Sequence, residues 1–342
     1  MSISRSEDAG EGDDVPDASP PLTLRVDDRY AGERLDKALA HLIPEVSRGR
    51  LQQWIGAGAV SVNGHTVIAR HALTFGDLVQ ITPQPAPDAA AFTPEPMPLD
   101  VVYEDDAILV LNKPPNLVVR PAAGHWSGTL LNGLLAYAPK LSEVPRAGIV
   151  HRLDADTSGL MVVAKTLAAH TDLVRQLQAR TVTREYWAVV LGVPAPRGVV
   201  DAAIGRDPRN PLRFKVSTME SAKPARTHYA RIDSSRSAGA EISWLACRLE
   251  TGRTHQIRVH LEHLGHPLIG DPLYRRKLPA RGDDVGSWRA FDRQALHACR
   301  LSLDHPVSKR RMTWFQVPAP DLERLMRALG FGPLDVANDV FQ

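Results

Sequence analysis

The sequence predicts an α+β protein whose sheet is mixed and mostly antiparallel, with a small helix and hairpin module in front of it. Short strand-like segments follow one another along most of the 342-residue chain, and long helices do not alternate regularly with them, as they would in a doubly wound fold. An Asn-Gly pair between two β-type segments at 60–67 predicts a tight hairpin. A proline- and alanine-rich stretch at 84–98 predicts a linker between two domains.

The first module is predicted over residues 21–83, from two helices and the hairpin. Apolar residues recur at helical spacing over 32–43. Ser47 has the side chain of a helix N-cap, and an apolar stripe follows it over 51–55. The hairpin follows these two helices, so the sequence predicts a small helix, helix, hairpin module that ends near residue 81.

The second domain is predicted over residues 99–330, followed by a C-terminal tail at 331–342. Apolar runs predict strands at 107–114, 160–164, 186–192, 241–250 and 256–261, and periodicity predicts helices at 129–137, 171–180 and 321–329. In the strand at 186–192, alternation places Tyr186, Ala188 and Val190 on one face.

Composition indicates a globular protein of the cytoplasm. Residues 1–20 hold six acidic residues and one arginine, a net charge of −5, and are predicted to be disordered because they have too few apolar residues to offset the entropy of ordering. Since the whole chain carries +2, the remainder carries +7, which favours an anionic partner. The two cysteines, Cys247 and Cys299, lie in apolar segments and are interpreted as buried thiols of a reducing compartment. Neither a targeting peptide nor a membrane span is expected.

The stretch 150-VHRLDADTSGLMVVAKT-166 concentrates charge beside an apolar strand. Asp156 begins an Asp-Thr-Ser-Gly run that is typical of a turn, since Asx side chains bond the backbone and glycine supplies positive φ. The run also resembles the Asp-Thr-Gly loop of aspartic proteases, but those enzymes need two such loops and this chain has one. Asp154 is the stronger catalytic candidate, because two residues from Arg152 on an extended stretch it shares a face with a cation that favours the charged carboxylate.

A second cation for Asp154 is predicted from 250-ETGRTHQIRVH-260. If residues 256–261 form a strand, alternation turns Arg258 toward a polar cleft while Ile257 and Val259 face the core. A surface ladder of arginines is the alternative for Arg258. Histidines at 255, 260, 263 and 266 raise the question of zinc, but their spacing matches no common ligand pattern, so no metal is expected.

The motifs together resemble those of the RluA-type pseudouridine synthases. The runs 111-LNKPPNLVV-119, 149-IVHRLDADTSGLMVVAKT-166, 184-REYWAVV-190, 251-TGRTHQIRVH-260 and 293-RQALHA-298 follow in the order and at the separations of that family. The module at 21–83 resembles the S4 RNA-binding domain that many members carry. The phrases 145-PRAGIVHRLD-154 and 288-WRAFDRQALHA-298 resemble the RluD branch, whose members modify uridines in the helix 69 hairpin of 23S ribosomal RNA.

The resemblance implies a reaction and a set of catalytic residues. It implies that uridine in RNA is isomerised to pseudouridine without a cofactor, with Asp154 as the essential carboxylate. Whether Asp154 attacks the ribose or acts as a base stays open. Tyr186 corresponds to the residue that lies against the base and is the candidate for the C5 proton, and Arg258 corresponds to the arginine that pairs with the aspartate. One position departs from the pattern, since Arg120 stands where relatives usually have histidine.

RNA-binding residues are expected in both domains. The resemblance implies that Arg152 holds RNA with the target base flipped out, and that Arg253 and His255 of the same motifs contact RNA. Arg48 and Arg50, near a helix start, are expected to bind phosphate, with a merely solvated helix face as the alternative.

The expected partner is ribosomal RNA, bound by a monomer. Two rival interpretations stay open: a family member that acts on transfer RNA or another ribosomal site, and a noncatalytic S4-type assembly factor.

Overall fold

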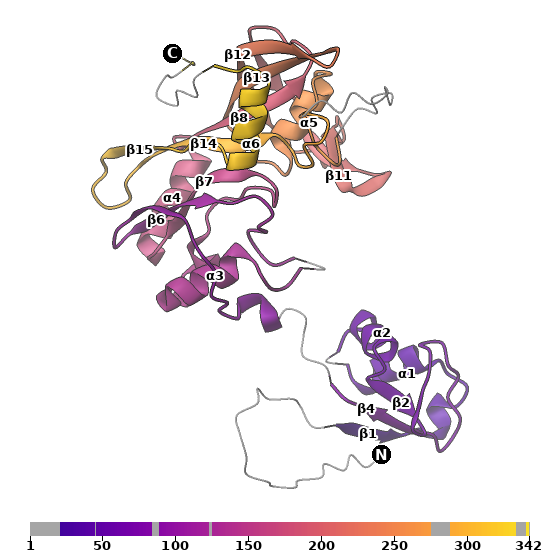
Figure 1. Ribbon diagram of the computed structural model, residues 1–342. Coiled ribbons are helices and arrows are strands. Elements are labelled where there is room, and N and C mark those ends of the chain that lie inside the picture. The colour runs from indigo at the N-terminus through magenta and orange to yellow at the C-terminus, as the bar shows by residue number, and fades with distance from the viewer. Residues whose placement is uncertain are drawn as a thin grey trace. The chain divides into compact units, whose positions relative to one another are not determined.

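The chain divides into two compact units, residues 1–89 and residues 90–342. The computed structural model describes residues 21–44, 46–83, 89–122, 125–274, 288–332 and 340–341 (Figure 1). The acidic N-terminal segment and the first part of the predicted linker, at 84–88, lie outside the described residues, as does most of the C-terminal tail.

The first unit joins two helices to a four-stranded antiparallel sheet with the order β1-β4-β2-β3. Its elements are β1 (Leu22–Arg25), η1 (Asp28–Tyr30), α1 (Leu35–Leu42), α2 (Arg48–Gly56), β2 (Val60–Val62), β3 (His65–Thr66) and β4 (Leu78–Ile81). The predicted cap is confirmed, because the Ser47 hydroxyl accepts a hydrogen bond from Arg50 N at 3.4 Å. The predicted hairpin is confirmed as well: Asn63 and Gly64 both have positive φ, as a two-residue turn of this kind requires.

The second unit is built on a nine-stranded sheet with the order β5-β6-β7-β14-β8-β13-β12-β9, and β15 pairs with β14. Among the strands of the described residues, only the pairing of β14 with β7 is parallel, so the predicted mixed and mostly antiparallel sheet is confirmed. The elements are η2 (Ala89–Phe92), β5 (Val101–Glu104), β6 (Ile108–Lys113), α3 (Leu130–Tyr137), η3 (Pro139–Glu143), η4 (Pro145–Gly148), β7 (Ser158–Ala164), α4 (Leu167–Gln178), β8 (Thr183–Leu191), β9 (Arg197–Asp201), β10 (Ile204–Asp207), β11 (Asn210–Val216), β12 (Arg226–Ser237), β13 (Ala240–Leu249), α5 (Gln256–His263), β14 (Leu296–Asp304), β15 (Arg311–Phe315) and α6 (Pro320–Ala328).

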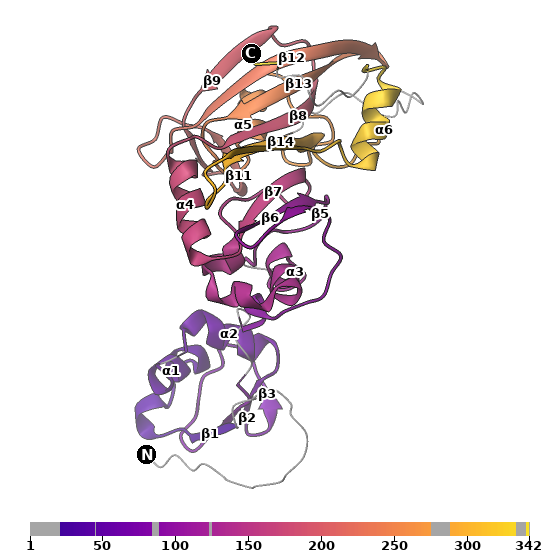
Figure 2. The ribbon, with the colours of Figure 1, turned by 90° about the vertical axis from the view of Figure 1, so that its left-hand side faces the viewer.

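Strand alternation gives this sheet two apolar faces, each covered by helices (Figure 2). In β8, Tyr186, Ala188 and Val190 pack in a cluster with α3 and α5, as the sequence predicts. Trp187 and Val189 of the same strand pack in another cluster with α6, and α4 packs against β6 and β7. The predicted buried thiols are confirmed, since both cysteines lie in the interior.

The strand predicted at 256–261 is wrong, because these residues belong to helix α5. Every residue from Gln256 to Leu261 is buried, so the alternation of polar and apolar residue types does not correspond to an alternation of exposure. Ile257 and Leu261 pack in the cluster beneath the sheet, whereas Val259 packs in a different one. Burial on several sides overrides the preference of β-branched residues for strands.

The second half of the predicted linker packs on α3. The Asn132 side chain donates to Thr93 O at 2.9 Å, and a Cβ on Gly133 would lie 2.5 Å from the Met97 side chain. Ala91 is buried. Residues 91–97 therefore contribute to the packing of the second unit. Over the described ranges, no helix has the length and apolar character needed to cross a membrane.

Candidate active site

The loop that carries Asp154 connects η4 to β7, and hydrogen bonds to its backbone carbonyl groups hold it in place. Lys113 of β6 is buried and donates to Ala155 O at 2.7 Å, and also to two carbonyl groups of its own segment. Arg293 donates to Asp156 O at 2.9 Å. Asp154 O accepts from Thr157 N at 3.1 Å, which closes a turn over 154–157. The turn predicted over 156–159 is thus displaced, since Ser158 and Gly159 already belong to β7. Two contacts from distant parts of the chain and one bond within the loop thus fix its backbone.

Gly159 lets this loop enter the sheet. It has φ of 115°, and a Cβ there would lie 2.3 Å from Ala298 O on the parallel strand β14. Only glycine combines that conformation with so close an approach. The strand β7 can therefore pair with β14 directly after the loop.

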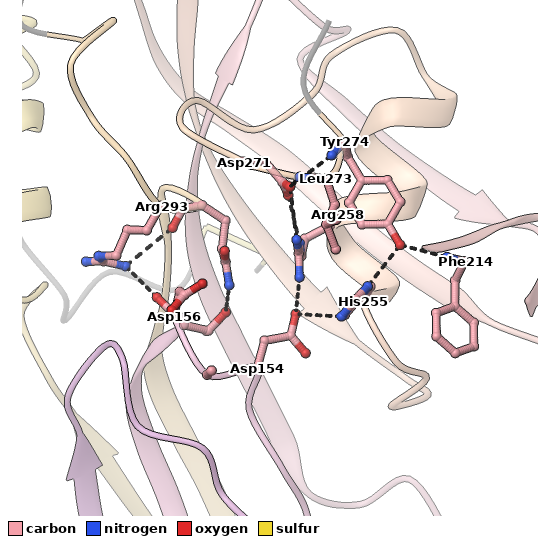
Figure 3. A network of polar contacts seen from close by, with 12 residues as sticks. Asp154, Asp156, Phe214, His255, Arg258, Asp271, Leu273, Tyr274 and Arg293 are labelled. Carbon is pink, nitrogen blue, oxygen red and sulfur yellow. Dashed lines mark hydrogen bonds and ion pairs between the residues drawn. The ribbon is translucent and has the colours of Figure 1, made fainter. Parts of the chain in front are cut away.

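Asp154 is joined to helix α5 by an ion pair (Figure 3). Arg258 Nη1 donates to Asp154 Oδ2 at 2.9 Å. Arg258 also donates from Nε and Nη2 to the two oxygens of Asp271, at 2.7 and 2.9 Å. The planar guanidinium is thus held bidentately by one carboxylate and presents its remaining nitrogen to the other. The side chains of Arg258 and Asp154 are 4% and 16% exposed, so this pair lies largely out of water.

Burial by itself would lower the pKa of Arg258, but the hydrogen bonds and charge of Asp271, followed by those of Asp154, outweigh it and raise that pKa. The Tyr274 ring lies 5.0 Å from the guanidinium and adds a cation–π contact. Asp271 in turn accepts from the backbone N–H groups of Leu273 and Tyr274. Arg258 is therefore a fixed cation, positioned before any substrate arrives.

His255 approaches Asp154 from the same wall. Its Nε2 lies 4.0 Å from Asp154 Oδ2, and its Nδ1 lies 2.9 Å from the Tyr274 hydroxyl. That hydroxyl oxygen accepts from Phe214 N, so its own hydrogen can point to Nδ1, which leaves the ring hydrogen on Nε2 facing the carboxylate. Burial lowers the pKa of His255 even though Asp154 opposes the shift. His255 thus adds a neutral donor to this wall.

Tyr186 reaches the same site from β8. It is buried, and burial, reinforced by Asp154 and opposed by Arg184, raises its pKa to about 12. At neutral pH the side chain is therefore a phenol. Among the described residues, Asp154, Tyr186 and Arg258 all line one cavity of about 580 Å³.

This cavity is rich in arginine. In the described part of the chain its lining includes seven arginines but two carboxylates, those of Asp154 and Glu250. The arginines are Arg120, Arg146, Arg152, Arg180, Arg184, Arg253 and Arg258. Such an excess of positive charge in a concave site attracts a polyanion. The predicted residues Arg152, Arg253 and His255 are all at this cavity, and both arginines are exposed.

The predicted pair in the first unit has a different setting. Arg48 donates from Nε and Nη2 to Asp36, whose carboxylate is inaccessible to solvent and also binds Arg34 and Gln52. Burial would raise the pKa of Asp36, but these three hydrogen-bond partners lower it to about 2. The Arg50 guanidinium stacks on Trp54 at 5.4 Å. Both arginines thus contribute to the folding of this unit, and half of the Arg48 side chain is exposed.

Comparison with known proteins identifies both units. The family model described as RNA pseudouridylate synthase matches residues 107–263, and the S4 domain model matches residues 33–79. The protein named ribosomal large subunit pseudouridine synthase D of Neisseria meningitidis serogroup A is 50% identical over 302 residues, which cover 88% of this chain and 79% of the relative. The chain belongs to the RNA pseudouridylate synthase family. The protein of the same name from Escherichia coli K12 is 46% identical over 313 residues, 90% of this chain and 94% of the relative.

Solved structures agree on the fold of the second unit. Human RNA pseudouridylate synthase domain containing 1 is 27% identical, with a TM-score of 0.50 over 70% of this chain and 98% of that one. Human RNA pseudouridylate synthase domain containing 4 has a TM-score of 0.52 and 24% identity over 68% of this chain and 93% of that one, and it supports the fold alone. The protein is accordingly a pseudouridine synthase, an isomerase of RNA.

Several residues of the site are absent from the sequence prediction. Asp271 holds Arg258, Tyr274 holds His255, and Arg293 holds the loop that carries Asp154. The Gly-Asp-Pro run at 270–272 indicates a turn, but nothing in it points to a partner 13 residues upstream. In the described residues, no cluster of three or more His, Cys, Asp or Glu side chains has the arrangement of a metal site.

Proposed function

We propose that this protein converts uridine to pseudouridine in the RNA of the large ribosomal subunit, with the helix 69 hairpin of 23S ribosomal RNA as its target. Relatives that are about half identical over most of their length are named for the large subunit. The sequence phrases around Asp154 and before His297 favour the same branch. Together these similarities point to one RNA among the substrates of the family.

The observation that carries the catalytic part of the proposal is the ion pair of 2.9 Å between Asp154 and Arg258, in a cavity that Tyr186 also lines. In the reaction the bond from ribose C1′ to uracil N1 breaks, the base turns, and a bond from C1′ to C5 forms. C5 loses a proton and N1 gains one, so the reaction consumes no oxidant or reductant. The site therefore has to supply a carboxylate at the ribose and a path for one proton.

In this proposal Asp154 is the carboxylate, and it acts at the ribose either as nucleophile or as base. Arg258 sets the position of the carboxylate through a charge-assisted hydrogen bond, which limits the geometries that Asp154 can adopt. Tyr186 packs against the target base. Because its pKa is raised to about 12, Tyr186 takes the C5 proton only by passing its own hydroxyl proton on, for example to a carboxylate.

The arginine-rich cavity is proposed to hold the RNA while the target base is out of its stack. Base extrusion costs a few kcal/mol, which contacts to phosphate and stacking offset. Arg152, Arg253 and His255 are candidates for these contacts, and Arg48 and Arg50 are candidates in the S4 unit. A single chain contributes every residue of the proposed site, so a monomer suffices. The ribosomal substrate places the reaction in the cytoplasm.

Mapping of pseudouridines across total RNA tests the proposal. In a strain that lacks the protein, we expect pseudouridine to disappear from helix 69 and from no transfer RNA. Complementation with the native chain restores the modification, whereas the Asp154→Asn chain at equal abundance does not. Loss of pseudouridine from transfer RNA alone, with helix 69 unchanged, would refute the proposed target.

A second test concerns the S4 unit. Removal of residues 1–83 should weaken binding of the substrate RNA by about tenfold or more, because phosphate contacts are lost, while the melting temperature of the remaining unit stays within a few degrees. The measurements are the dissociation constant and calorimetry on both proteins. Equal affinity of the shortened protein would contradict a role of this unit in RNA binding.

A further inference from the structure

Arg184 is a buried cation that lacks a partner in the described part of the chain. It lies at the start of β8 and lines the same cavity as Asp154. The residue is 9% exposed, and its Nε is inaccessible to solvent and makes no hydrogen bond. No carboxylate lies within ion-pair distance of its guanidinium among residues 21–44, 46–83, 89–122, 125–274, 288–332 and 340–341. A buried charge without a counter-charge is costly, so it calls for a ligand that supplies one.

The neighbours of Arg184 do not supply a negative charge. His151 Nε2 accepts from Val162 N at 3.0 Å, which places its ring hydrogen on Nδ1. Burial, followed by the charge of Arg184, lowers the pKa of His151 to about 3, so this ring is neutral. Burial lowers the pKa of Arg184 as well. Burial is the main cause of both shifts, and the charge of Arg184 adds to the shift of His151.

The two carboxylates of the cavity are already engaged elsewhere. Asp154 pairs with Arg258 at 2.9 Å. Glu250 pairs with Arg180 at 3.1 Å, and its other oxygen lies 2.6 Å from His228. Among the described residues, neither acidic group of the cavity therefore neutralises Arg184, which leaves its charge available to an anionic ligand.

The position of Arg184 along β8 restricts what this anion is. Arg184 and Tyr186 are two residues apart in one strand, so their side chains leave the same face about 7 Å apart. Tyr186 is the residue proposed to lie against the target base. A group of RNA that lies about 7 Å from that base is the sugar-phosphate backbone, so Arg184 would face the backbone. A Cβ on Gly252 would lie 2.8 Å from Arg184 Nη1, so the absence of a side chain at position 252 leaves room for the guanidinium at this point.

We propose that the Arg184 guanidinium binds a backbone phosphate of the RNA next to the target uridine, inside the catalytic cavity. The planar fork of an arginine matches two phosphate oxygens. The negative charge of the phosphate would balance the positive charge of Arg184, which has no carboxylate partner among the described residues. The inference rests on membership in the RNA pseudouridylate synthase family and not on the identity of the RNA.

The first test measures how RNA binding depends on salt. All variants carry Asp154→Asn to prevent turnover, and the probe is a labelled hairpin RNA that the native protein has been found to modify. We expect Arg184→Met to weaken binding by about tenfold or more and to reduce the slope of log Kd against log salt by about 0.7, the value for one phosphate of a single strand. Arg184→Lys keeps the charge and should retain most of the slope. Arg236→Met, an exposed arginine of β12 outside the cavity, is the matched control and should change neither quantity measurably.

The second test locates the phosphate. Methylphosphonate, which removes one negative charge, replaces each phosphate near the target uridine in turn. We expect one position at which the substitution weakens binding to the parent protein but has no further effect on Arg184→Met, so that the two changes are not additive. Fully additive effects at every position would overturn the proposal. A second result would also overturn it: Arg184→Met leaves the salt slope unchanged and, in a protein that keeps the native Asp154, slows the single-turnover rate. The guanidinium would then act on the uracil. If the native protein does not modify helix 69, the proposed RNA target is refuted but the proposal for Arg184 is still tested, because the probe is any RNA that the protein does modify.

Discussion

Two arginines of one cavity are both buried and have opposite surroundings. Arg258 on α5 is 4% exposed and binds two carboxylates, whereas Arg184 on β8 is 9% exposed and binds none in the described residues. The pKa of Arg258 is raised because hydrogen bonds and carboxylate charge outweigh burial. The pKa of Arg184 is lowered because burial dominates. A guanidinium that has its counter-charges positions a catalytic group, and one that lacks them is suited to receive an anionic ligand.

The difference separates a proposed catalytic role from a proposed binding role within one cavity. The wall formed by α5 is organised in advance, with Asp271 fixing Arg258 and Arg258 fixing Asp154. On β8, Arg184 has no carboxylate partner among the described residues, and the proposed RNA phosphate would supply the missing negative charge. Substitution of Arg258 or of its anchor Asp271 should therefore affect kcat, and substitution of Arg184 should affect binding.

The largest effect is expected from Asp154→Asn, which removes the proposed catalytic carboxylate. Activity should fall by about four orders of magnitude or more, because no other carboxylate of the cavity can replace it. RNA binding should change by a few-fold at most. Release of tritium from C5-labelled RNA measures the activity. Asp156→Asn is the matched control and should keep at least about a tenth of it; comparable losses in both variants would place the chemistry elsewhere.

Asp271→Asn sharpens the comparison, because it leaves Arg258 buried with one carboxylate in place of two. We expect kcat to fall about a hundredfold with little change in KM, since Asp154 loses its fixed geometry. Stability should drop by about 3 kcal/mol, as for other broken buried ion pairs. Urea unfolding and steady-state kinetics measure both. Asp201→Asn, whose carboxylate pairs with Arg226 at the surface, should cost less than about 0.5 kcal/mol. A native kcat in Asp271→Asn would show that Arg258 needs no second anchor.

A smaller effect is expected from Asp321→Asn on α6, far along the chain from the reaction. Asp321 binds Arg293 through two hydrogen bonds of 2.6 and 2.8 Å, and Arg293 binds the loop at Asp156 O. Loosening of this loop should lower kcat by about five- to tenfold with RNA affinity kept. Glu323→Gln on the same helix, which removes an ion pair with the exposed Arg327, is the control and should leave kcat unchanged. A weakened RNA affinity with native kcat would instead assign α6 to binding.

The smallest effect on activity is expected for His297, a buried side chain that loses its proton on folding, whereas Arg184 keeps its charge. Burial lowers the pKa of His297 from 6.5 to about 4, although its hydrogen bond to Gln316 O opposes the shift. The unfolded chain therefore binds the additional proton, and stability that is complete above pH 6.5 is lost as the pH falls toward 4, by up to about 3 kcal/mol. His297→Gln should flatten this part of the stability curve in urea titrations at successive pH values. A slope identical to that of the native chain would contradict the prediction.

Some features of the fold could be predicted because they depend on neighbouring residues. Ser47 caps α2, and Asn63 and Gly64 form the turn of a hairpin. Both features depend only on residues a few positions apart in the sequence. The alternation in β8 assigns Tyr186 to the correct face, because period-2 burial follows from the strand itself. The segment at 256–261 was not predictable in this way: it is buried on several sides, so its residue types carry no single period and the preference of isoleucine and valine for strands was misleading.

The sequence by itself determined the family, the candidates Asp154, Tyr186 and Arg258, and the capped and turned elements, since these depend on residue order and local geometry. Only the tertiary structure decided which charges meet. Asp271 reaches Arg258 across 13 positions and Arg293 reaches the catalytic loop across 137, whereas Arg184 meets no carboxylate among the described residues. Electrostatic energy depends on distance in space and on burial, and neither quantity can be read from the separation of two residues along the chain.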